Sequence, residues 1–138
     1  MDKTPHGYVP NTPLIHEMRL DKEPFEMIKN GRKTVELRLN DERRKCIKPG
    51  DLIRLLLRDS DEMILIRVTA LYRAESFAIL FETGGLLAKC GWGNLTPSEA
   101  AQMMRKYYSE EDEIIHGALG IEFSVIIKEP IETPIIAL

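Results

Sequence analysis

Three side chains in one short segment have the types and spacing to bind a polar ligand. Lys33, Glu36 and Arg38 lie within six residues, and Glu36 and Arg38 are two positions apart, so on a strand they project from the same face. A carboxylate accepts hydrogen bonds from a base or sugar edge, and a guanidinium donates two hydrogen bonds to a phosphate or a carbonyl edge. On an exposed strand the same pair would only neutralise each other weakly. The residues alone leave both interpretations open.

The segment around them is strongly basic. Residues 29–48 contain eight lysines and arginines and three acidic residues, a charge of +5 in a chain whose formal net charge is −3. A local patch of this kind favours phosphate binding, while the overall charge excludes a polycation. Arg43 and Arg44 are candidate phosphate contacts on charge and proximity. A solvated loop balanced by nearby acids explains the composition equally well.

The pattern Gly31-x-Lys33-x-x-Glu36-x-Arg38 resembles the GxKxxExR signature of the ASCH superfamily, relatives of the PUA domain. The resemblance covers roughly residues 13–127, in the family's order of elements. It implies an α+β fold, a small PUA-like β-barrel of five to six strands with two to four flanking helices. It also implies a basic cleft lined by Lys33, Glu36 and Arg38, with Gly31 shaping its approach. RNA or a nucleotide-like small molecule is then the expected partner, with no cofactor.

An enzymatic role is the alternative. Some small family members are similar to amidohydrolases that deacylate modified cytidine with a threonine, a lysine and a glutamate. Lys33 matches that lysine, but Glu36 stands at the threonine position, Thr34 is offset along the strand, and residues 91–95 lack the family's glutamate. A hydrolase would therefore have to use Lys33 and Glu36, with Glu36 as general base for water. A protein-interaction module is a third interpretation.

The element that carries the pattern is predicted to be a strand. Residues 33–40 alternate between polar and apolar types, which predicts one buried face made of Val35, Leu37 and Leu39. A helix over residues 21–29 precedes it, and Gly31 lies where helices commonly end in a left-handed residue. This helix end would place Lys33 at the entrance of the strand.

The remaining elements complete an α+β pattern. Further strands are predicted at residues 14–20, 52–58, 63–72 and 118–127. Further helices are predicted at residues 76–82, after Thr96 and after Ser109. The Thr96 start is the best marked, because Pro97 and Glu99 complete a capping box. The apolar side of that helix is predicted to be Met103, Met104 and Tyr107.

Charged residues and turn-forming residues predict the connections between these helices and strands. Residues 41–48 are predicted to be a charged loop, and residues 48–51 a type II turn with Pro49 and Gly50 at its centre. The acidic residues 110–113 are predicted to be a solvated helix cap. Residues 1–12 are predicted to be an irregular lead-in, and residues 13–138 a single domain.

Other side chains limit the chemistry. Trp92 lies between two glycines and is a candidate stacking platform for a base, or alternatively a core anchor. The three histidines are scattered and the two cysteines form no CxxC pair, so no metal site is expected. No apolar run approaches the ~20 residues of a membrane span. The sequence start lacks the apolar core of a signal peptide, so a cytoplasmic protein is expected.

Overall fold

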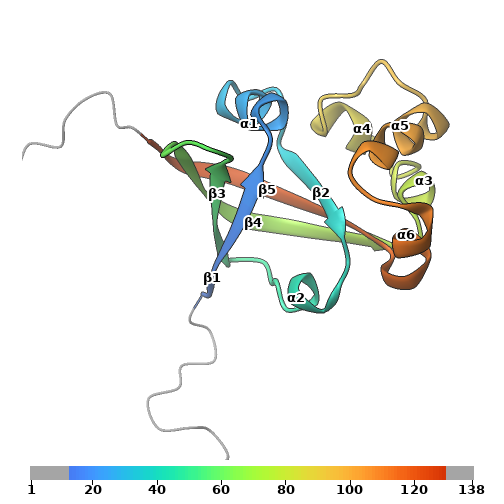
Figure 1. Cartoon of the computed structure of the whole chain (residues 1–138), viewed down its shortest axis with the longest axis horizontal. Coiled ribbons are helices and arrows are strands. Elements are labelled where there is room, and N and C mark those ends of the chain that lie inside the picture. The colour runs from blue at the N-terminus through green and yellow to red at the C-terminus, as the bar shows by residue number, and fades with distance from the viewer. Residues whose placement is uncertain (1–12, 130–138) are drawn as a thin grey trace, which may run out of the picture.

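The five strands form one mixed sheet that curls into a half-barrel (Figure 1). The structure is a computed structural model that describes residues 13–129, so the lead-in predicted at residues 1–12 lies outside the described residues, as do residues 130–138. The strand order is β1-β3-β4-β5-β2, with β1 parallel to β3 and the other neighbours antiparallel. The strands are β1 (Ile15–Leu20), β2 (Val35–Leu39), β3 (Leu52–Leu57), β4 (Met63–Ala74) and β5 (Ala118–Glu129). The predicted α+β, PUA-like fold is confirmed.

Short helices surround the sheet. They are α1 (Lys22–Lys29), α2 (Glu42–Lys45), α3 (Phe77–Leu80), α4 (Leu86–Lys89), α5 (Pro97–Met103), the 3-10 turn η1 (Met104–Lys106) and α6 (Glu110–His116). Six α-helices lie among the described residues, two more than the two to four expected. The additional ones are the single turns α2 and α4. The prediction of a charged loop at residues 41–48 is wrong at residues 42–45, which form the helical turn α2. Asp41 caps this turn by accepting a hydrogen bond from the Arg44 N–H. Within residues 13–129, no helix is long and apolar enough to cross a membrane.

The long strands β4 and β5 bring the two edges of the sheet together. They pair over their whole length, with register shifts at Leu65/Ile66 and at Val68/Ala70. Such irregularities increase the twist of a strand pair. β3 pairs with the first part of β4, whereas β2 pairs with the first part of β5, at the opposite end of the ribbon. The edge strands β1 and β2 therefore face each other across the half-barrel.

Two hydrophobic clusters hold this arrangement, one on each side of β2. The first fills the half-barrel under α1 and includes Phe25, Ile53 and Ile121. The second packs α3, α4, α5 and η1 against the other face and includes Val35, Leu37, Leu39, Phe77 and Leu86. The predicted buried face of β2 is confirmed, because all three of its apolar side chains belong to the second cluster.

Two glycines hold turns that position the strands. Gly31 has φ +84° and ends α1: its N–H donates to the Ile28 oxygen, and the Arg32 N–H donates to the Met27 oxygen. This is the Schellman pattern that favours glycine. Gly50 has φ +95°, as the third residue of a type II turn requires. Both sequence predictions are confirmed.

Candidate functional site

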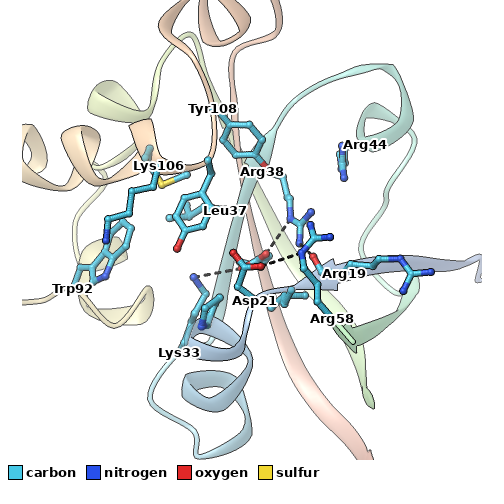
Figure 2. Close-up of a pocket in the computed structure, with 15 residues that line it drawn as sticks. Arg19, Asp21, Lys33, Leu37, Arg38, Arg44, Arg58, Trp92, Lys106 and Tyr108 are labelled. Atoms are coloured by element: carbon cyan, nitrogen blue, oxygen red, sulfur yellow. Dashed lines mark hydrogen bonds and ion pairs between the residues drawn. The ribbon is translucent and has the colours of Figure 1, made fainter. Parts of the chain in front are cut away.

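A pocket of about 360 Å³ opens between the two edge strands (Figure 2). Arg19 and Leu20 of β1 line one side, and Arg38 of β2 lies on the other. The Arg38 guanidinium spans the gap, because its Nη2 donates a hydrogen bond to the Arg19 main-chain oxygen at 2.8 Å. The rest of the lining comes from several parts of the chain: Asp21, Pro24, Lys33, Glu36, Leu37, Arg44, Arg58, Trp92, Met104, Lys106, Tyr107 and Tyr108.

Lys33, Glu36 and Arg38 form one ion-pair network in this pocket. Lys33 Nζ lies 3.3 Å from Glu36 Oε1, and Arg38 Nε donates to Glu36 Oε2 at 2.9 Å. These side chains are 7%, 7% and 11% exposed, so they do not form an exposed surface pair. Burial follows from register: Glu36 pairs with Ile121 and Arg38 with Leu119, and both partners belong to the core of the half-barrel.

The network is charged in spite of its burial. Burial alone would raise the pKa of Glu36, but the charges and hydrogen bonds of Lys33 and Arg38 outweigh it and hold that pKa below its ordinary value. Burial alone would lower the pKa of Arg38, and the Glu36 carboxylate outweighs it and raises that pKa. Two basic side chains thus share one carboxylate, which leaves a formal charge of +1.

The whole lining is basic. It contains six lysines and arginines and two acidic residues, a formal charge of +4. Arg44 pairs with Asp41 at 2.7 Å, and Arg58 with Asp21 at 3.0 Å. Arg19 and Lys106 also line the pocket, and neither forms an ion pair with any residue that the structure describes. Much of the unneutralised charge therefore comes from these two side chains and from the network.

Three aromatic side chains contribute to the wall. Lys33 Nζ lies 5.9 Å from the centroid of the Trp92 ring, and Phe81 meets Trp92 edge-on at 6.2 Å. Tyr108 is stacked on Phe77, with ring centroids 6.0 Å apart and an interplanar angle of 11°. Tyr107 is 44% exposed.

Comparison with known proteins gives the family. The family model of the ASCH domain matches residues 18–127. The chain belongs to the ASCH domain family. No curated protein matches this ASCH domain.

Solved structures share its fold. Hypothetical protein PH0355 is 33% identical, with a TM-score of 0.70 over 82% of this ASCH domain chain and 100% of the other. The solution structure of protein PF0455 from Pyrococcus furiosus is 34% identical, with a TM-score of 0.62 over 82% of this chain and 98% of the other. An ASCH domain from Lactobacillus crispatus has the same fold at 16% identity, with a TM-score of 0.53. The match covers 81% of this chain and 79% of the other.

The pocket gathers some of the residues predicted to bind a ligand in this ASCH domain, but not all. Five of the seven line it: Lys33, Glu36, Arg38, Arg44 and Trp92. Gly31 is exposed at the end of α1, outside the lining, and its turn places Lys33, whose N–H donates to the Met27 oxygen. Arg43 is exposed on α2 and lines a neighbouring hollow with His16. Within residues 13–129, no three His, Cys, Asp or Glu side chains are placed to hold a metal ion.

Sequence reasoning missed one side of the pocket. Tyr107 was expected on the apolar side of a helix, but α5 ends at Met103 and Tyr107 follows η1 at the pocket. Arg19, Arg58 and Lys106 lie outside the basic segment of residues 29–48, on β1, after β3 and in η1. Nothing in the local pattern distinguishes them from solvated charges, so only the tertiary structure assigns them to the lining.

The acidic run before β5 was also misread at one position. Glu113 was expected to be part of a solvated cap, but it is buried. Its carboxylate accepts hydrogen bonds from the Phe77 N–H and from Arg105 Nη2. It therefore ties α6 to α3 and to η1, the segment that carries Lys106 into the pocket wall.

Proposed function

We propose that this ASCH domain binds RNA or a nucleotide-like ligand in the pocket between β1 and β2. The observation that supports this most is the buried network in which Lys33 and Arg38 share the single carboxylate of Glu36. Buried cations are costly unless they are paired, and a phosphate would complete the pairing with charge-assisted hydrogen bonds. The basic lining around the network would attract the same ligand.

The network also has hydrogen-bonding capacity left for a ligand. A guanidinium carries five N–H donors. Arg38 uses one on Glu36 and one on the Arg19 oxygen, and its side chain also interacts with Tyr108. A carboxylate has about four acceptor positions, and Lys33 and Arg38 account for two at Glu36. In the proposed complex Arg38 and Lys33 hold a phosphate, with Arg44 as a further contact. Glu36 orients both cations and accepts from a base or sugar group.

The electrostatics of Glu36 favour binding over hydrolysis. A general base works best when its pKa lies near the working pH. Two cations hold the pKa of Glu36 below its ordinary value, which makes this carboxylate a weak proton acceptor. An amidohydrolase built on Lys33 and Glu36 would need that proton transfer.

We further infer that residues 13–138 act as one domain and that binding takes place in the cytoplasm. The family model spans most of this range. Both cysteines, Cys46 and Cys90, are free thiols, and Cys46 is exposed, which suits a reducing compartment.

Fluorescence anisotropy with labelled single-stranded RNA and with mononucleotides tests the proposal. Binding should weaken as salt rises from 50 to 200 mM, because phosphate contacts release counterions. Arg44→Ala should weaken binding and reduce the slope of log K against log salt by about 0.7 to 1. Arg38→Lys, which retains the charge and loses the fork geometry, should weaken binding in a folded protein. Arg67→Ala is the matched control, because Arg67 is an exposed strand residue outside the pocket.

Absence of salt-sensitive binding to any RNA or nucleotide would overturn the proposal. Turnover of N-acetylated cytidine that vanishes in Lys33→Ala would instead support the hydrolase. Stoichiometric capture of a protein segment by the pocket, without nucleic acid, would support the interaction module.

A further inference from the structure

The aromatic side chains of the pocket differ in the ring surface they leave open. The Lys33 ammonium lies over the Trp92 ring, and Phe81 packs against Trp92 from another side. One face of Tyr108 is covered by Phe77. Tyr107 is 44% exposed, and its ring makes no aromatic or cation–π contact with any described residue. Tyr107 is therefore the aromatic side chain best placed to accept a stacked base.

Two cations without an ion-pair partner among the described residues, Arg19 and Lys106, line the same pocket as this ring. Lys106 precedes Tyr107 in the chain, and Arg19 comes from the opposite wall of the pocket (Figure 2). Arg58 and Arg44 already have acidic partners, whereas Arg19 and Lys106 have none among residues 13–129. A stacking ring flanked by cations is the usual means of holding single-stranded nucleic acid.

The size of the pocket sets the amount of ligand it can enclose. Its volume of about 360 Å³ lies near the lower end of the roughly 300–1,000 Å³ typical of small-molecule sites. Double-stranded RNA is bound differently, mostly by its shape and over a broad surface (about 16 base pairs for a double-stranded-RNA-binding domain), because its bases are stacked inside. The buried network closes the floor, so a base can enter only from the open side.

We propose, on the basis of the proposed function, that the pocket takes one unpaired nucleotide from a single-stranded or terminal RNA position. Its base stacks on Tyr107, and its flanking phosphates contact Arg19 and Lys106. Trp92 then has a supporting role, because its ring holds the Lys33 ammonium. This assigns the stacking role to Tyr107 and not to Trp92, and it makes the domain selective for unpaired RNA.

The test compares a fluorescein-labelled single-stranded RNA decamer with its blunt-ended, G·C-closed duplex. The single strand should bind at least about ten-fold more tightly than the duplex. Tyr107→Ala should weaken binding of the single strand about 5- to 150-fold, the range that base–aromatic stacking gives. Tyr107→Phe retains the ring and should bind within about two-fold of the wild type. Combined Arg19→Ala and Lys106→Ala should reduce the salt slope by about 1.4.

Each result bears on a separate step. Equal affinity for single strand and duplex would overturn the selectivity and leave the proposed function standing. Wild-type affinity in Tyr107→Ala, with circular dichroism confirming its fold, would overturn the stacking role. Arg67→Ala should retain the wild-type salt slope. Binding of no RNA or nucleotide at all would overturn the proposed function itself.

Discussion

Replacing Glu36 with glutamine tests the buried network directly. The substitution keeps the shape of the side chain and removes the charge that Lys33 and Arg38 share at 3.3 and 2.9 Å. Removing one member of a buried ion pair costs about 3–5 kcal/mol, because the partner charge is left uncompensated. Since Gln can still accept one hydrogen bond, we expect the lower end of this range, about 3 kcal/mol.

Urea denaturation measures this change in the free energy of unfolding, and a melting temperature lower by about 10 °C should accompany it. Glu17→Gln is the matched control. Glu17 pairs with Arg54 at 3.6 Å on the exposed side of the sheet, where such pairs contribute about 0.2–1 kcal/mol. If Glu36→Gln costs no more than Glu17→Gln, solvent reaches the network and our account of the pocket floor is wrong.

The pH dependence gives a second readout of the same perturbation. The pKa of Glu36 is lowered in the folded protein, so the unfolded chain binds a proton more readily. The stability from Glu36 is therefore fully present above about pH 4.5, the ordinary pKa of the carboxyl, and is lost as pH falls through the folded pKa. The difference in unfolding free energy between wild type and Glu36→Gln should shrink as the pH falls below 4.5. A constant difference down to pH 2 would contradict this linkage.

Three further predictions follow from other contacts. Asp51→Ala should lower the free energy of unfolding, measured by urea denaturation, by about 1–3 kcal/mol. The reason is that buried Asp51 accepts hydrogen bonds from the Leu14 and Lys48 N–H groups and pairs with His16. A change below about 0.5 kcal/mol would show that water replaces these bonds. Thr96→Ala removes one half of the capping box and should lower the free energy of unfolding by about 1 kcal/mol in the same assay. Ser98→Ala, in the first turn of α5, should change it little. Ellman's reagent should titrate Cys46 in the native protein and Cys90 only after unfolding, because burial raises the pKa of Cys90 to about 12; rapid labelling of both thiols in the folded state would contradict this burial.

Local signals predicted most of the secondary structure. The alternation at residues 33–40 predicted β2 and its buried face, and the residues around Thr96 predicted the start of α5. These signals depend on neighbouring residues alone, which is why they are readable without the fold. Three helices, α2, α3 and α4, have only four residues each, and so short a segment carries little periodicity. Of these, α3 was predicted, whereas α2 and α4 were missed.

The candidate site was predictable only on the strand that carries the family pattern. Lys33, Glu36 and Arg38 are neighbours in the chain, so their common face follows from strand geometry. Arg19, Arg58 and Lys106 reach the same pocket from segments up to 87 positions apart in the chain. Their meeting depends on the twist of the β4–β5 ribbon, which no local pattern encodes.

The amino-acid order by itself determined which side chains point the same way, where α1 and the turn at Gly50 end, and that residues 29–48 are basic. Tertiary structure alone decided that the polar face of β2 is enclosed. Exposure of a side chain depends on what packs over it, and the cover here comes from β1 and from the segment around Tyr107, both remote in sequence. At a surface, an ion pair such as Glu36–Arg38 is weak because water screens its charges. In the buried network few solvent molecules are present to screen them.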